Sequence, residues 1–170
     1  MLGGDASRVA LAGESAGGNR ALATAIVARD KGVQAPSAVP AVYPIAGTDT
    51  NTDSYRVYAD AKPLSRPLIQ WFFGHYMRTP ADAQDARLNL VAANLKGLPP
   101  TTIISAQIDP LRFEGELIAA RLSAAGATVR SRTLDGAAHE FFGQGAAVPL
   151  AREAVRFGAD GLTSAFSRNH

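Results

Sequence analysis

A serine with possible catalytic chemistry lies in a short segment between two glycines. The segment is Gly13-Glu14-Ser15-Ala16-Gly17, with an apolar run before it and an alanine-rich run after it. In that context the pattern is typical of a nucleophile elbow, a sharp turn from strand to helix that exposes a serine hydroxyl. Small residues belong there because the strand and the helix approach closely. A serine that only caps the helix would also fit this position.

A serine hydroxyl is a poor nucleophile at neutral pH unless a base accepts its proton and a carboxylate orients that base. The chain has three histidines that could act as the base. His170 ends the chain, and His75 lies four residues after Trp71 in an aromatic segment, where packing or surface exposure accounts for it. His139 lies in a predicted loop between the last strand and the last helix, and it is the candidate base.

Asp109 is the candidate carboxylate. It comes shortly after an apolar, β-branched run and directly before Pro110. An aspartate in that place is also common as a turn residue or helix cap, and His139 alone would pass for a solvated loop histidine. Together with the elbow, however, the residues predict a triad in which Ser15 is the nucleophile, Asp109 the acid and His139 the base.

The elements that must position these side chains alternate between strand and helix. Strands are predicted over residues 8–13, 38–43, 101–106 and 128–133, and helices over 16–29, 113–125, 148–166 and an aromatic segment that begins at Pro67. Pro40 is a weak point of the second strand, and residues 45–63 are predicted to form a long loop. Such alternation favours parallel βαβ units, which carry functional groups beyond the carboxyl ends of their strands.

Composition narrows the class of protein. A chain of 170 residues with 46% hydrophobic and 19% charged residues predicts one globular domain over residues 1–170. The absence of cysteine excludes disulfides and thiolate chemistry. No signal sequence or long apolar segment is found, so we expect a cytoplasmic protein that does not span a membrane. Net charge is only +2 and the arginines are scattered, so no nucleic-acid partner is expected.

Several segments resemble the hormone-sensitive-lipase-like esterases, which form bacterial family IV of the α/β-hydrolases (α/β-hydrolase fold-3). The resemblance extends over almost the whole chain, with small departures at Glu14, Phe113 and Glu140. The matching segments are Gly13-Glu14-Ser15-Ala16-Gly17-Gly18-Asn19, Val42-Tyr43-Pro44, Leu98-Pro99-Pro100, Asp109-Pro110-Leu111-Arg112-Phe113-Glu114-Gly115 and Asp135-Gly136-Ala137-Ala138-His139-Glu140-Phe141-Phe142-Gly143.

This resemblance implies a function for the triad. Ser15 would attack the carbonyl of an ester with a short to medium acyl chain, His139 would transfer the proton, and Asp109 would hold the imidazole. The chain order of the three residues is the one expected of α/β-hydrolases. The resemblance implies a small ester as the substrate and requires no cofactor or metal.

The resemblance also implies an incomplete α/β-hydrolase fold. Family members carry a cap and an H-G-G-G loop well upstream of the elbow, and this sequence contains no H-G-G-G segment. We therefore expect a mostly parallel sheet of about four strands flanked by helices, without the amino-terminal strands and the cap. The backbone N–H of Ala16 is the one oxyanion donor that the sequence offers. Loss of the other donors predicts impaired catalysis.

Two alternatives and one further expectation follow from this departure. The chain could be an inactive remnant or association module, or an enzyme that cleaves lactones, thioesters or amides at the same elbow. Glu14, Arg112 and Glu114 flank the triad and could tune it, although compensation of helix-end charges explains the carboxylates equally well. A bare apolar edge strand favours association, so we expect a homo-oligomer formed through that edge.

Overall fold

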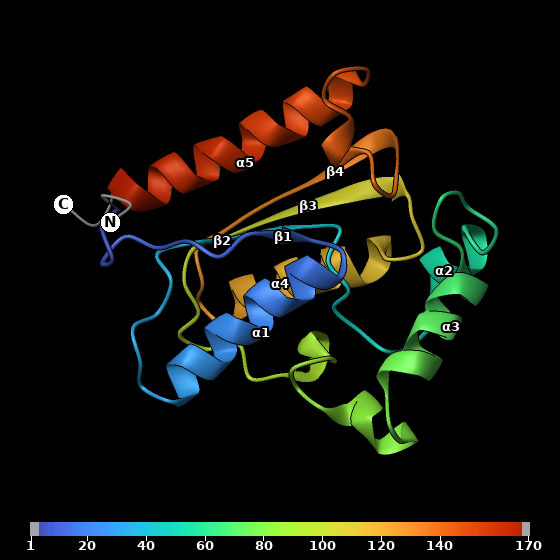
Figure 1. The fold of residues 1–170 in the computed structure, drawn as a ribbon, viewed down its shortest axis with the longest axis horizontal. Helices are drawn as coiled ribbons and strands as arrows, with labels where there is room; N and C mark the ends of the chain where they lie inside the picture. Colours follow the sequence, from blue (N-terminus) through green and yellow to red (C-terminus); the bar gives the residue numbers. More distant parts are fainter. Residues whose placement is uncertain (1–3, 168–170) are drawn as a thin grey trace.

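A four-stranded parallel sheet organises the chain. In the computed structural model, which describes residues 4–167, the strands lie side by side in chain order (Figure 1). Their bounds are β1 Gly13–Glu14, β2 Val39–Val42, β3 Thr101–Ile108 and β4 Val129–Ala138. The expectation of a parallel sheet of about four strands is thus confirmed, while His170 lies outside the described residues.

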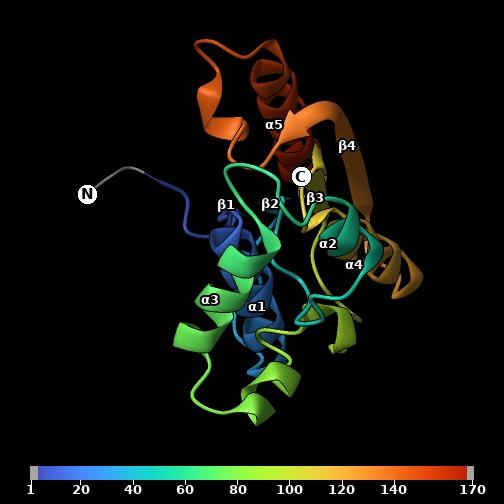
Figure 2. The same ribbon diagram turned by 90° about the vertical axis from the view of Figure 1, so that its right-hand side faces the viewer.

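Helices cover both faces of this sheet. Figures 1 and 2 show α5 on one face and α1 and α4 on the other, while α2 and α3 lie together near the end at which β3 finishes. The bounds are α1 Ala16–Asp30, α2 Asp53–Val57, α3 Arg66–Tyr76, α4 Arg112–Ala124 and α5 Pro149–Ser167, with short 3₁₀ helices at Pro80–Gln84, Leu90–Ala92 and Phe142–Gln144. Within residues 4–167, no helix is both long and apolar enough to cross a membrane.

The core has two layers, one on each face of the sheet, and neighbouring residues of a strand belong to different layers. Ala41 and Ile103 are buried against α1 and α4, whereas their neighbours Val42 and Ile104 are buried against α5. Successive strand residues point to opposite faces, so a strand covered on both sides must be apolar at every position. This requirement explains why β2 is buried at all four residues.

The first strand is shorter than predicted. Residues 8–13 were expected to form a strand, but β1 covers only Gly13–Glu14 and is preceded by an isolated bridge at Ala10. Val39 and Tyr43 of the neighbouring segment donate their N–H groups to carbonyls on the β3 side. Pro40 therefore faces β1, where it has no N–H to donate. The ladder is interrupted at this proline, as its position in the sequence suggested.

The last strand is longer than predicted. The sequence placed its end at Thr133 and a loop at residues 135–139, but β4 continues to Ala138. A register shift opposite Gln107 absorbs the extra residues, and Gly136, at φ 74°, donates its N–H to the Gln107 side chain at 2.7 Å. The first part of the predicted loop therefore forms a bulge within the strand. As a consequence, His139 follows the end of the strand directly.

The segment that was predicted to be a long loop contains a short helix. Helix α2, Asp53–Val57, lies within residues 45–63. Five residues are too few to show a helical period in the sequence, so the pattern gave no sign of it. The following helix α3 begins as predicted, with proline in its first turn and Ser65 accepting a hydrogen bond from Leu68 N–H.

Two glycines of α5 provide a matched test of its packing on the sheet. A Cβ at position 161 would overlap the hydroxyl of Thr102, whereas one at position 158 would make an ordinary contact with Ile104 at 3.7 Å. We expect Gly161→Ala to lower the free energy of unfolding by about 1–3 kcal/mol through overpacking. Gly158→Ala should raise it by about 0.5–1 kcal/mol, the gain in helix propensity. Urea titration of both variants decides this, and equal effects would contradict it.

Candidate active site

The turn from β1 into α1 presents Ser15. Its backbone has φ 54° and ψ −120°, a conformation that residues with a side chain rarely adopt. A Cβ at position 13 would overlap the carbonyl group of Gly17, so glycine is required there by the close approach of the two backbones. A Cβ at Gly17 itself would meet open space. The two glycines of the pattern therefore have different roles. Gly13 lacks a side chain so that the backbone of residue 17 can approach it, whereas a side chain at position 17 would meet no neighbouring atom.

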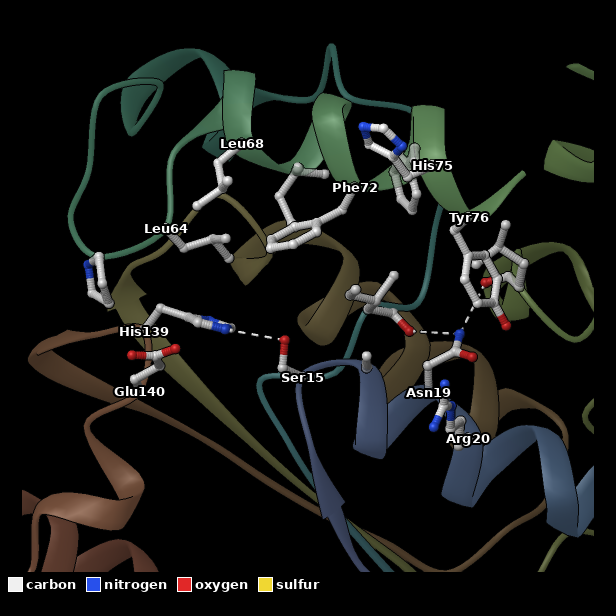
Figure 3. Close-up of a pocket in the computed structure, with 16 residues that line it drawn as sticks. Ser15, Asn19, Arg20, Leu64, Leu68, Phe72, His75, Tyr76, His139 and Glu140 are labelled. Atoms are coloured by element: carbon white, nitrogen blue, oxygen red, sulfur yellow. Dashed lines mark hydrogen bonds between the residues drawn. The ribbon is translucent and has the colours of Figure 1, made fainter. Parts of the chain in front are cut away.

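Hydrogen bonds join the three predicted side chains in one line. His139 Nε2 lies 3.1 Å from the Ser15 hydroxyl, and His139 Nδ1 lies 2.7 Å from Asp109 Oδ2. An ionised carboxylate can only accept, so Nδ1 carries the proton and Nε2 is free to accept from the serine. Figure 3 shows the imidazole edge pointing at the Ser15 hydroxyl. The structure thus brings together residues that are up to 124 positions apart in the chain.

Asp109 is fully buried and has a second hydrogen bond. Its Oδ1 accepts the Leu111 N–H at 2.9 Å, so the carboxylate is fixed by the turn that starts α4. That turn is held from the other side by Ser54 of α2, whose hydroxyl donates to the Pro110 carbonyl at 2.6 Å and accepts the Phe113 N–H. Helix α2, which the sequence did not reveal, therefore supports the predicted acid.

An apolar cavity of about 470 Å³ opens beside Ser15. Its floor is the start of α1, and its roof is the inner side of α3 together with the segment before it (Figure 3). The roof contributes Leu64, Leu68 and Phe72, and His139 lies next to the serine at one side. The cavity is the natural place for an apolar group attached to a carbonyl that approaches Ser15.

The backbone of the loop after β2 is hydrogen-bonded to the elbow and to the helix that follows it. Ile45 donates its N–H to the Ser15 carbonyl at 3.2 Å, and its own carbonyl accepts from the Asn19 side chain at 2.9 Å. Asn19 also donates to the Leu88 carbonyl, so one buried amide joins three segments of the chain. Ile45, which lines the cavity, is held in place by these bonds.

A buried carboxyl group also holds the loop after β2 in place. Glu114 exposes 3% of its surface, and its Oε1 accepts the Ala46 N–H at 2.8 Å. Burial raises the pKa of the Glu114 carboxyl to about 8, against the lowering effect of backbone hydrogen bonds and with smaller raising contributions from Asp109 and Asp49. The group is therefore neutral over most of the physiological range, which makes its burial beside Asp109 tolerable.

Other residues that the sequence singled out lie apart from the serine. Arg112 is 3.9 Å from Glu116 and stacks over the ring of Tyr58. Phe141 is buried in the core under α5, and Phe142 packs against the same cluster. His75 packs against Trp71 at 4.4 Å between ring centroids, and it lines the far part of the cavity.

Sequence reasoning missed the residues that shape the cavity. Leu68, Phe72 and Tyr76 recur every four residues on α3, a spacing that indicates one helical face but does not say which face is turned to the serine. It also missed Tyr43, whose ring centroid lies 4.4 Å from that of His139. The only signal for Tyr43 was its place in a matching segment at the end of a strand.

This chain is similar in sequence to known hydrolases, in agreement with the geometry around Ser15. A family model described as alpha/beta hydrolase fold matches residues 1–143. The carboxylesterase NlhH of Mycobacterium tuberculosis is 36% identical over 170 residues, which cover 96% of this chain and 53% of that protein. The ethyl acetate hydrolase of Pseudomonas putida is 30% identical over 156 residues, which cover 91% and 49%.

Solved structures give the same result. EstE1, a thermostable carboxylesterase cloned from a metagenomic library, superposes with a TM-score of 0.92 at 34% identity and covers 96% of this chain and 57% of its own. An esterase from Pyrobaculum calidifontis has a TM-score of 0.92 at 36% identity, with 96% and 55% covered. The chain thus spans about half the length of the relatives it matches.

The neutral state of Glu114 predicts a pH-dependent contribution to stability. The carboxyl ionises at about 4.5 when unfolded and at about 8 when folded, so stability that is complete below pH 4.5 is lost as the pH rises toward 8. Glu114→Gln mimics the neutral carboxyl and removes this pH dependence of the stability. We expect the unfolding free energy of the wild type to fall relative to the variant across that window, by about 1.4 kcal/mol per pH unit at most.

The measurement is urea unfolding at closely spaced pH values. Glu116→Gln, an exposed carboxylate two residues further along α4, is the control and should follow the wild type. A constant difference between the wild type and Glu114→Gln at all pH values would show that Glu114 is ionised in the folded chain.

Proposed function

This chain belongs to the α/β-hydrolase fold family, in its hormone-sensitive-lipase-like branch, and we propose that it is a serine carboxylesterase acting through an acyl-enzyme. The observation that carries the proposal is the hydrogen-bonded line from Ser15 through His139 to Asp109 at the edge of an apolar cavity. A serine that only capped a helix would not require a buried imidazole and carboxylate in line with its hydroxyl.

Acylation begins with attack of the Ser15 oxygen on the ester carbonyl carbon. The hydroxyl proton passes to His139 Nε2, 3.1 Å away, and the carbonyl π electrons move to its oxygen. The resulting imidazolium is stabilised by Asp109, which keeps its negative charge and holds Nδ1–H. When the tetrahedral intermediate collapses, the bond to the leaving alkoxide breaks and His139 returns the proton to it, which leaves an ester of Ser15.

Deacylation repeats these steps with water. His139 takes a proton from a water molecule that attacks the acyl carbon, and Ser15 leaves as the new alcohol when the imidazolium protonates it. The ester, the water and the three side chains supply every proton and electron pair, so the proposal invokes no cofactor.

The oxyanion that forms in both halves of the reaction needs hydrogen-bond donors. Ala16 is the first residue of α1 and lines the cavity, and an N–H in the first helical turn has no acceptor within its own helix. No H-G-G-G segment occurs in the 170 residues. For this chain of 170 residues we expect turnover at least about 10²–10³-fold below that of an esterase with a complete oxyanion hole, because a single missing donor already has an effect of that size.

The cavity supports esters of short to medium acyl chains as substrates. Its lining is apolar where Leu64, Leu68 and Phe72 meet, and its volume of about 470 Å³ is at the small end of ligand sites. An acyl chain would lie under α3 with its carbonyl beside Ser15. The ethyl acetate hydrolase among the similar proteins is named for a short ester.

Hydrolysis of p-nitrophenyl acetate, butyrate and octanoate by the purified chain tests the proposal. We expect Ser15→Ala and His139→Gln to lower kcat/KM by at least about 10³-fold, because each removes a member of one catalytic unit. His75→Gln is the matched control. This histidine packs against Trp71 in the far part of the cavity, away from the reacting atoms, so its loss should leave the rate with the acetate ester almost unchanged.

The same assay decides between the esterase and its alternatives. Rates in the wild type equal to those of Ser15→Ala would contradict the esterase proposal and favour a remnant whose triad has no turnover. Cleavage of a lactone, thioester or amide in preference to the three esters would keep the nucleophile but change the substrate class.

We further infer that residues 1–170 form one unit that associates with a second copy through β1. Among residues 4–167, no strand pairs with the outer edge of β1, and Val9 beside it exposes 46% of its surface. Unpaired apolar edges favour association, and a lysine there opposes it. In sedimentation velocity we expect the wild type to form dimers or larger species, and Val9→Lys to shift toward the monomer.

Val155 provides the control for this experiment. It is 45% exposed but lies on helix α5 and not on the sheet, so Val155→Lys should sediment like the wild type. A wild-type chain that is monomeric at all concentrations, or an equal effect of both lysines, would rule out association through β1.

A further inference from the structure

The imidazole of His139 has a neighbour besides Ser15 and Asp109. The ring of Tyr43 lies against it with centroids 4.4 Å apart and planes inclined by 48°. Tyr43 exposes 1% of its surface and also packs edge-on against Phe141 at 5.8 Å. An aromatic side chain packed on both sides in this way has little freedom to move. Its position therefore limits the positions open to the histidine.

The backbone of Tyr43 is in an unusual conformation. Its φ is 32°, and its N–H donates to the Ile104 carbonyl at 2.5 Å as the last bond between this segment and β3. Positive φ is unfavourable for an aromatic residue, and it persists only where surrounding contacts hold it. The chain thus keeps a strained residue at a position from which its ring contacts His139.

The hydroxyl of Tyr43 is anchored to the nucleophile elbow. It donates a hydrogen bond at 2.5 Å to Oε2 of Glu14, the residue immediately before Ser15. Burial, reinforced by this carboxylate, raises the pKa of the Tyr43 phenol far above its usual value, so the group stays a donor. Glu14 itself is exposed, so nothing in the core requires its charge. The bond connects the elbow to the ring that contacts His139.

We propose that Tyr43 and Glu14 form a positioning pair, in which the anchored ring keeps the His139 imidazole aligned with both Ser15 and Asp109. This inference rests on the proposed function, because alignment matters only if His139 is the base. Asp109 holds one nitrogen of the ring, and a single hydrogen bond leaves the imidazole free to swing about that nitrogen. The contact from Tyr43 restricts this swing and keeps Nε2 directed at the serine hydroxyl.

The hydrogen bond, rather than the bulk of the ring, is the element to test. Tyr43→Phe keeps the ring and removes its anchor, while Glu14→Ala removes the acceptor at an exposed position. Glu14→Gln keeps an acceptor without the charge. Tyr58→Phe, a tyrosine of the α2 segment that stacks on Arg112, is the matched control. Urea unfolding of each variant checks that the fold is retained.

The first readout is independent of reactivity. The proton on His139 Nδ1, hydrogen-bonded to Asp109, gives a downfield NMR signal whose exchange with water measures how often the imidazole leaves its place. We expect about tenfold faster exchange in Tyr43→Phe and in Glu14→Ala, the equivalent of about 1.4 kcal/mol. The double variant should exchange no faster than either single one, because both remove the same bond. Glu14→Gln and Tyr58→Phe should resemble the wild type.

The second readout is the rate at which diisopropyl fluorophosphate labels Ser15. It should fall about tenfold in the same two variants, again without a further loss in the double variant, and recover in Glu14→Gln. Unchanged exchange and labelling in Tyr43→Phe and Glu14→Ala would overturn the positioning pair, as would losses that multiply in the double variant. If the wild type is not labelled, the proposed function fails, and the exchange rates alone decide whether the pair positions His139.

Discussion

The strained turn at Ser15 is the constraint on which the rest of the structure depends. A residue with a side chain is held at positive φ only because the backbone on both sides is fixed. The Ser15 N–H donates to the Val42 carbonyl, and its own carbonyl accepts from Ile45 and from Asn19. The close approach of residues 13 and 17 leaves no room for a larger side chain at the first of them. Strand, helix and following loop thus meet at one residue, and its hydroxyl is left pointing outward.

Parallel pairing places the remaining groups near this turn. Three strands that run in the same direction release the chain at the same end of the sheet, so Asp109 and His139 emerge beside the serine although they are distant in sequence. The two residues are fixed in different ways. Asp109 is fixed by the first turn of α4 and by Ser54 of α2, and His139 by a β4 strand that a bulge extends to its neighbour.

Buried polar groups hold the other segments around Ser15 in place. Asn19 and Glu114 satisfy the backbone of the loop at residues 45–46, and that loop forms the side of the cavity next to the serine. The neutral state that burial imposes on Glu114 avoids a second negative charge close to Asp109. Tyr43 has a comparable place on the other side, between the elbow and the imidazole. In each case a side-chain hydrogen bond links segments that are far apart in the sequence.

The sequence by itself determined the class of fold and the candidate triad. Apolar runs that alternate with helical segments and a serine between two glycines are local patterns, and local patterns can be read from the chain. Only the tertiary structure decided where β1 begins and where β4 ends, because strand length depends on a partner: Pro40 interrupts one ladder and the bulge at Gly136 extends the other. It likewise decided which face of α3 covers Ser15, and that Tyr43 and Glu114 lie beside the triad, since such contacts depend on packing between segments that no local period encodes.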